Sequence, residues 1–362
     1  MNSLRTIAKT FFKIGLIGFG GGPGMLALIR SECVKKKKLI CDDDLTTAVA
    51  IGQILPGPFV PNYCEYIGYC LAGFKGAVVA GVSLLLPSFI IMLILSYLYF
   101  TFHTLPAINQ IFKGIGAVMT AIILWAGIDM GRLIINNFKR IIVFIFAFTL
   151  FLFKFDPVLT VLLAGGLSIL LEQIKSPKLF LAVPMFLFDI RKAIELFGIF
   201  LKIGAVIFGG GYAAIPFIQN EVCVYRDWLT TREFLDGFAL GQITPGPVAI
   251  TATFVGFKVM GIFGALISTI GIFLPSFIML IILIKIYKKI EHNRYVQSFL
   301  NGIKSAVVAI LLSTGIIFVP MNWFNIVYGI FGIICLVILL FVKKIDPFIL
   351  VVTGIIFGII NG

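Results

Sequence analysis

The sequence predicts an all-α membrane protein that crosses the bilayer many times and is built from two inverted copies of one unit. Of its 362 residues, 60% are apolar and only 12% are charged, and the mean hydropathy is +1.11. An ordinary soluble domain has about 25% charged residues. Apolar runs such as residues 76–100 and 261–286 exceed the roughly 20 residues that a helix needs to cross about 30 Å of hydrocarbon.

The N-terminal segment, MNSLRTIAKTFFKIGLIGFGGG, has the basic start and apolar middle of a secretory signal. No A-x-A cleavage pattern follows it, and KIGAVIFGGG repeats its second part in mid-chain. We therefore expect it to belong to the mature protein.

A repeat divides the chain. GQILPGP begins at residue 52 and GQITPGP at residue 241, an offset of 189 (241 minus 52), and LPSF at residue 86 returns at residue 274, an offset of 188. Self-similarity over so long a period indicates duplicated structural units. The predicted halves are residues 1–188 and 189–362.

The charges of the loops indicate that the halves are inverted. Residues 30–38 carry five positive charges while residues 219–227 carry one, and residues 98–106 carry none while residues 285–294 carry four. Because Lys and Arg mark the cytoplasmic side, equivalent loops are expected on opposite sides. We expect 30–38 and 285–294 inside, and 98–106 and 319–328 outside.

The same loops imply that one apolar segment does not cross. Two segments, 46–72 and 76–101, separate loops that are expected on opposite sides, so one of them must enter and leave on one face. The first contains PGP at 56–58, and irregular backbone at membrane depth must line protein or water. We expect about ten crossings plus two broken or re-entrant segments.

Broken helices at equivalent places in two inverted halves point to a substrate site. A helix start exposes N–H groups and about half a positive charge, which suits a tetrahedral oxyanion. Glycine runs there permit close approach of the backbone, although they also serve tight helix packing. The predicted substrate-binding residues are Lys13, Gly20, Gly21, Gly22, Gln53, Pro56 and Gly57 in the first half, and Lys202, Gly209, Gly210, Gly211, Gln242, Thr244, Pro245 and Gly246 in the second.

The polar candidates have simpler alternatives. A lysine within an apolar segment is a functional candidate, but Lys13 and Lys202 also suit snorkelling near a helix end. Gln53 and Gln242 can donate to an anion or bond carbonyls freed by the helix break. Glu32 and Glu221 are candidates for binding a coupling proton, or are solvated loop residues.

Other classes of protein are disfavoured. The formal charge of +13 is spread over short clusters between apolar runs, which suits the anionic inner leaflet of a bilayer and not nucleic acid. The six cysteines have no metal-ligand spacing, and no nucleophile elbow, Walker, HExxH or dinucleotide motif occurs. We expect no catalytic residue, metal or cofactor, and therefore no enzyme.

Several motifs resemble the chromate transporter (CHR) family of bacteria and archaea. They are FGGGYAAIPFIQNEV, GQITPGPVAITATFVG and GIFLPSF in the second half, with FGGG, LPGP and LPSF at matching places in the first. The resemblance implies the fused two-domain form of a carrier in the cytoplasmic membrane that exports chromate, with sulfate as a related ligand. Where family members often carry a histidine after the first glycines, this chain has Pro23-Gly24-Met25.

Export of a dianion has an electrical rationale. An inside-negative potential favours its exit by about 4.6 kcal/mol per 100 mV, so a uniport or modest proton exchange suffices. A carrier for sulfate or another small anion, with chromate incidental, is the alternative. A channel is disfavoured because few polar residues recur along any span. One fused chain should suffice for transport and is compatible with a homodimer.

Overall fold

The computed structural model describes residues 4–18, 21–102, 106–153, 155–171, 190–208, 210–290, 294–342 and 347–361, and the regular structure in these ranges is entirely helical. The first half contains α1 (Leu4–Ile17), α2 (Gly21–Ile29), η1 (Arg30–Lys36), α3 (Asp42–Ile54), α4 (Phe59–Phe102), α5 (Pro106–Ile134), α6 (Phe138–Leu152) and α7 (Pro157–Leu170). The second contains α8 (Ile190–Val206), η2 (Gly211–Ala213), α9 (Ala214–Gln219), η3 (Asn220–Tyr225), α10 (Thr231–Ile243), η4 (Val248–Ile250), α11 (Thr251–Ile290), α12 (Arg294–Asn322), α13 (Ile326–Phe341) and α14 (Pro347–Asn361).

Helices begin at similar caps in the two halves. The Thr230 side chain accepts from the backbone N–H of Glu233, whose carboxylate accepts from the Thr230 backbone N–H, and this capping box starts α10. Asn137 and Asn325 each accept from the backbone N–H three residues ahead, at the starts of α6 and α13. The caps differ by 188 (325 minus 137), which is the offset of the sequence repeat.

The two longest helices, α4 and α11, are each folded back on themselves. Helical geometry fails in α4 at Ala72 and Gly73, where the glycine has a φ of +60°. In α11 it fails at Met260 and Gly261, with a φ of +59°. These φ values favour glycine because it has no Cβ. Each helix therefore has a short first arm (59–71 or 251–259) and a long second arm (74–102 or 262–290), numbered in chain order.

Glycines let the two arms of α4 and of α11 touch. A Cβ on Gly68 would overlap the backbone of Gly76, and one on Gly256 would overlap the backbone of Gly264. Close contact of backbones is the role of small residues in membrane helices. The arms are thus antiparallel, and the long arms of 29 residues extend about 43 Å at 1.5 Å per residue.

The short helices before the breaks also run antiparallel to the arms that follow them. A Cβ on Gly52 of α3 would overlap the ring of Tyr63, and one on Gly237 of α10 would overlap the ring of Phe254. In each pair, the two residues lie on opposite sides of a PGP motif in the sequence. At 13 residues, α3 extends about 20 Å, which is less than the hydrocarbon thickness. Each half therefore contains a helical hairpin with PGP at its tip.

In the part of the chain that the structure describes, four helical segments are long and apolar enough to cross a membrane: Phe59–Phe102, Gln110–Ile134, Val248–Ile284 and Tyr295–Asn322. Shorter apolar helices are Pro157–Leu170, Ile326–Phe341 and Pro347–Asn361. The expectation of about ten crossings stays a prediction, as does the inversion of the halves.

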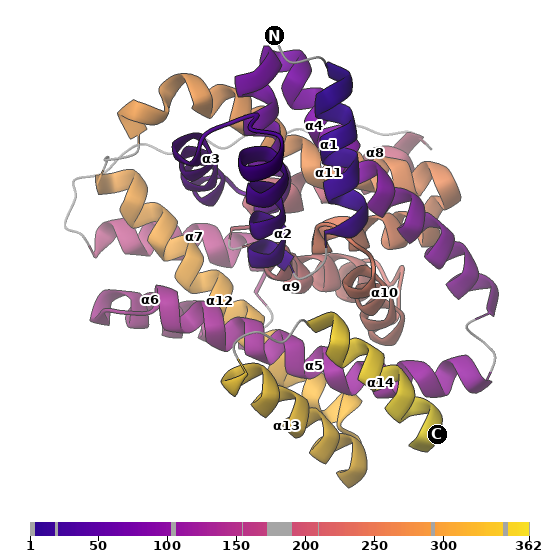
Figure 1. Ribbon diagram of the computed structural model, residues 1–362. Coiled ribbons are helices and arrows are strands. Elements are labelled where there is room, and N and C mark those ends of the chain that lie inside the picture. Colours follow the sequence, from indigo (N-terminus) through magenta and orange to yellow (C-terminus); the bar gives the residue numbers. More distant parts are fainter. Residues whose placement is uncertain are drawn as a thin grey trace.

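The helices form two groups, one of α1–α4 with α8–α11 and one of α5–α7 with α12–α14. In the view of Figure 1, the indigo helices α1–α3 lie at the opposite end from the yellow helices α13 and α14. Within the second group, helices of one half pack against helices of the other half. Gly114 of α5 abuts Gly354 of α14, and Gly302 of α12 abuts Gly165 of α7. The halves defined by the sequence repeat are therefore interleaved in space.

Candidate functional site

The PGP motifs interrupt the helical structure between α3 and α4 and between α10 and η4. Gly57 has a φ of +96° and Gly246 a φ of +109°, which residues with a Cβ rarely adopt. The prolines lack an N–H and end the preceding helix. Glycine is therefore required at the centre of each motif by the backbone itself.

Each PGP glycine bonds to the other half of the chain. The N–H of Gly57 donates to the carbonyl of Ile207 at 2.6 Å, and the N–H of Gly246 donates to the carbonyl of Gly18 at 2.8 Å. Ile207 and Gly18 are equivalent positions (207 minus 18 is 189). We expected these two N–H groups to face an anion, and in this structure they are instead occupied by backbone carbonyls.

Two serines that the sequence analysis used only as repeat markers belong to the same junction. The hydroxyl of Ser88, in LPSF of α4, donates to the carbonyl of Pro245 at 2.6 Å, and a Cβ on Gly246 would overlap it. Ser276, in LPSF of α11, lies against Gly57, where a Cβ would come within 2.6 Å of the serine Cβ. Each LPSF serine thus contacts the PGP motif of the other half. Their recurrence at the repeat offset was the signal that could have found them.

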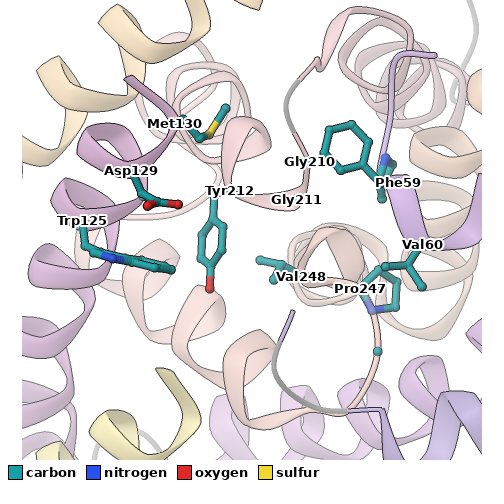
Figure 2. Close-up of a pocket in the computed structure, with 13 residues that line it drawn as sticks. Phe59, Val60, Trp125, Asp129, Met130, Gly210, Gly211, Tyr212, Pro247 and Val248 are labelled. Carbon is teal, nitrogen blue, oxygen red and sulfur yellow. The ribbon is translucent and has the colours of Figure 1, made fainter. Parts of the chain in front are cut away.

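A cavity of about 260 Å³ lies between these tips (Figure 2). Three chain segments that begin helices line it, at the starts of α4, of η2 and of η4. The first N–H groups of a helix have no partner within it, and the positive end of the dipole lies there. The lining residues are Pro58, Phe59, Val60, Trp125, Ala126, Asp129, Met130, Gly210, Gly211, Tyr212, Gly246, Pro247 and Val248.

The α5 side of the cavity was not foreseen. Figure 2 shows Trp125 and Asp129 of α5 beside the ring of Tyr212. The rings of Trp125 and Tyr212 pack edge to face, with centroids 6.3 Å apart. Asp129 is exposed, and no lining residue is a lysine or arginine. An acidic residue inside a helix expected to span the membrane was the available signal for Asp129.

The glycine runs are only partly described. Gly20 and Gly209 lie outside the described residues, and Gly21 and Gly22 begin α2. Gly210 and Gly211 line the cavity, and Gly210 has a φ of +94°. A Cβ on Gly210 would come within 3.2 Å of the Phe59 ring. The second run thus touches the start of α4, as a close approach of the backbone requires.

The polar residues of the second PGP motif lie near the cavity. Gln242 accepts a hydrogen bond from the hydroxyl of Tyr212 at 3.3 Å, and its buried Nε2 has no partner among the described residues. Thr244 is buried, and its hydroxyl donates to the carbonyl of Leu240 in its own helix. Gln53 is exposed. Pro56 and Pro245 are buried, beside the Gly57 and Gly246 contacts.

The lysine and glutamate candidates pair with one another away from the cavity. Lys13 lies 3.0 Å from Glu32, and Lys202 lies 2.9 Å from Glu221. Lys36 also contacts Glu32, and Arg226 contacts Glu221. Both carboxylates are buried, so neither is a solvated loop residue. Hydrogen bonds from Lys36 and then Lys13 hold the pKa of Glu32 below its ordinary value.

Helices that break at equivalent places and bring backbone from both halves to one interior cavity are the architecture of secondary membrane transporters. The profile that describes the chromate transporter family matches residues 5–169 and again 194–359. The chain belongs to this family, as its motifs indicated, and the family is one of transporters and not of enzymes.

Several curated proteins are similar over most of the chain. An uncharacterized transporter of Methanocaldococcus jannaschii is 32% identical over 340 residues, covering 87% of this chain and 84% of its own. The chromate transport protein of Pseudomonas aeruginosa is 32% identical over 330 residues, covering 84% and 79%. The probable chromate transport protein of Synechococcus elongatus is 28% identical over 353 residues, covering 92% and 89%. No solved structure matches the chain significantly.

Proposed function

We propose that the chain is a secondary carrier that exports chromate, or a tetrahedral oxyanion like it, across the cytoplasmic membrane. The anion binds in the cavity between the hairpin tips. The observation that carries the proposal is that three helix starts, from both halves, line this one cavity. Two relatives named for chromate transport support the choice of anion.

The cavity suits weak, reversible binding of an anion. N–H groups at helix starts supply partial positive charge without a full cationic side chain. A volume of about 260 Å³ accommodates a small oxyanion with part of its hydration, since each water occupies about 30 Å³ of liquid. A carrier must also release its substrate, and a site without Lys or Arg binds a dianion less tightly than one with them.

Asp129 gives the cavity an acidic edge. Its carboxylate repels a dianion bound beside it, by about 2 kcal/mol at 4 Å in surroundings as polar as water. We expect Asp129→Asn to lower the Kd for sulfate by a factor of about ten to thirty at neutral pH. Isothermal titration in detergent measures this, and an unchanged or raised Kd contradicts the placement of the anion near Asp129.

The two halves act as inverted repeats around this site. The reciprocal bonds of Gly57 and Gly246 support a two-fold relation between them. We expect single cysteines at positions 36 and 226 to react with impermeant reagents from opposite faces of the membrane. Reaction from one face at both positions contradicts the inversion.

Transport itself is tested with purified protein in liposomes. Chromate and sulfate uptake is measured with and without a proton gradient, against protein-free liposomes. We expect saturable chromate uptake in which sulfate competes. Saturable uptake of sulfate or of a small carboxylate, without chromate uptake, favours the alternative in which the carrier serves another anion.

The location of the site is tested by protection of a thiol. Val248 lines the cavity, so a single cysteine at Val248→Cys in a cysteine-free chain should be alkylated more slowly when sulfate is bound. Sulfate is used because it shares the shape and charge of chromate and does not oxidise thiols. The matched control is Val224→Cys on η3, which is 55% exposed and away from the cavity. Equal rates with and without sulfate at Val248→Cys refute this location.

A further inference from the structure

A second cavity contains a buried carboxyl group that the anion site does not use. Glu65 lies in the first arm of α4, one helical turn after Asn62, and is 3% exposed. Within the described part of the chain, its Oε2 has no hydrogen-bond partner, and neither amide atom of Asn62 has one. No basic side chain among the described residues forms an ion pair with Glu65. The carboxyl is therefore buried without compensation.

The second arm of α4 leaves space for this side chain. A Cβ on Gly81 would come within 2.8 Å of Oε1 of Glu65. The equivalent residues of the second half are Thr253 and Thr269, since 253 minus 65 and 269 minus 81 both give 188. Their hydroxyl groups share a hydrogen bond of 2.7 Å. In the second half, the equivalent contact between arms is therefore made by two neutral, hydrogen-bonded threonines. Packing of the arms does not by itself require a carboxyl group.

Glu65 faces a cavity of about 440 Å³ between α4 and α11, at the junction of the two halves. Apart from Glu65 and Thr269, the lining is glycine, aliphatic and aromatic. The other lining residues are Val78, Gly81, Val82, Leu85, Leu86, Phe89, Leu266, Ile270, Phe273, Leu274 and Phe277. The Thr269 hydroxyl is already hydrogen-bonded to Thr253 and Ala265, and no other described group in this lining stabilises a negative charge.

No salt bridge or hydrogen bond joins Glu65 to a described charged side chain on a neighbouring element. Of those with described side chains, α1 has Arg5, Lys9 and Lys13, α3 has Asp42, Asp43 and Asp44, α10 has Arg232, Glu233 and Asp236, and α11 has Lys258, while α2 and η4 have none. The other titratable residues of α4 are Tyr63, Cys64, Tyr66, Tyr69, Cys70, Lys75, Tyr97 and Tyr99. Lys13 pairs with Glu32, and Lys258 pairs with Glu233.

The physical consequence is a link between protonation and conformation. An unpaired carboxylate in apolar surroundings is strongly disfavoured, so the group stays neutral while it is buried. It can lose its proton only when water or a polar partner reaches it. Movement of α4 against α11 would change that access, because the cavity lies between these helices.

We propose that Glu65 binds the proton that is exchanged for the transported anion. This inference rests on the proposed carrier function. The carboxylate takes one proton from water on the outer side, carries it as a neutral carboxyl while the cavity is closed, and releases it to water on the inner side. No other bond forms or breaks, and the anion moves in the opposite direction.

The test compares two transport modes of the full chain in liposomes. In counterflow, labelled sulfate outside exchanges for sulfate inside, and no proton moves. In gradient-driven uptake, an acidic interior at pH values where sulfate is fully ionised drives sulfate inward while protons leave. We expect wild-type protein to show both. Absence of counterflow in wild-type protein refutes the carrier function, whereas counterflow without any effect of the gradient refutes only proton exchange.

Variants then assign the proton to Glu65. Glu65→Gln keeps the size of the side chain, and the double variant Glu65→Thr with Gly81→Thr copies the hydrogen-bonded pair of the second half. We expect both to keep counterflow and to lose the stimulation by the gradient. Asp43→Asn, an exposed carboxylate on α3, is the matched control and should behave as wild type.

Two outcomes overturn the proposal. Gradient-driven uptake of wild-type size in Glu65→Gln shows that another group carries the proton. Loss of counterflow in both the Gln variant and the double variant, in protein that remains monodisperse, assigns Glu65 to the structure or to the anion path instead. A pH-sensitive dye trapped in the liposomes measures the proton flux directly and should report none in either variant.

Discussion

The contact between Gly246 and Ser88 makes a quantitative prediction about the junction of the halves. Gly246→Ala places a residue with a Cβ at a φ of +109°, which costs about 1–3 kcal/mol. The new methyl group also overlaps the Ser88 hydroxyl, which must leave the carbonyl of Pro245 and lose a buried hydrogen bond of about 1 kcal/mol. We expect a destabilisation of about 2–4 kcal/mol.

A second substitution separates the two causes. Ser88→Ala removes the overlapping hydroxyl, and the remaining Cβ of residue 88 lies 3.1 Å from a Cβ on Gly246, a close contact that a shift of a few tenths of an ångström relieves. Adding Gly246→Ala to Ser88→Ala should therefore cost only the backbone term, about 1–3 kcal/mol. At the other junction, the closest atom to a Cβ on Gly57 is the Cβ of Ser276, at 2.6 Å. Ser276→Ala keeps that atom and should not relieve Gly57→Ala.

The assay is thermal unfolding in detergent, followed by the fraction of protein that stays monodisperse. The four single variants, the two double variants and the wild type form two double-mutant cycles. We expect coupling in the Gly246 and Ser88 cycle, and none in the Gly57 and Ser276 cycle. A Gly246→Ala protein as stable as wild type, or equal coupling in both cycles, refutes this reasoning.

Three further outcomes follow from the structure. Lys202→Gln should cost no more than about 1 kcal/mol of stability, because Lys202 is half exposed. It should leave the sulfate affinity measured by titration unchanged, because Lys202 lies outside the anion cavity. A tenfold loss of affinity would show that Lys202 belongs to the anion site. The ion pairs of Glu32 hold its pKa below the ordinary value of 4.5, so they stabilise the fold above pH 4.5, and this stabilisation is lost as the pH falls below that value. Over that pH range, the thermal midpoint of the wild-type protein should therefore fall more than that of Glu32→Gln. Gly256→Leu should prevent accumulation in the membrane, since its side chain would overlap the backbone of Gly264, whereas membrane immunoblots should show normal amounts of Ile262→Leu, which is 63% exposed.

The sequence predicted the places where helices break better than it predicted what the breaks contact. Two prolines around a glycine cannot continue a helix, so the interruptions at 56–58 and 245–247 follow from local chemistry alone. The partners Ile207 and Gly18 are backbone carbonyls, which leave no trace in the identity of a residue. The bonds of Gly57 and Gly246 to them therefore could not be read from the sequence.

The ionic candidates show a similar limit. Lys13 and Glu32 recur together with Lys202 and Glu221 at the repeat offset, and this recurrence is why they were chosen as candidates for substrate binding and proton coupling. Their separation of 19 residues in the chain gives no indication that they meet. In the structure each lysine lies beside its glutamate, because the chain reverses between α1 and η1 and between α8 and η3. Asp129 has no recurring counterpart, so the repeat could not draw attention to it.

The bond from Gly57 to Ile207 also bears on how the protein is made. The two residues are 150 positions apart (207 minus 57). A ribosome adds about 5–20 residues per second, so roughly 8–30 s pass between the synthesis of the donor and that of its acceptor. During that time the N–H of Gly57 lacks its acceptor, the carbonyl of Ile207, and α5 lacks the surface of α14 that Gly114 contacts. Insertion of the first half can thus precede its final structure, which is completed only as the second half is translated.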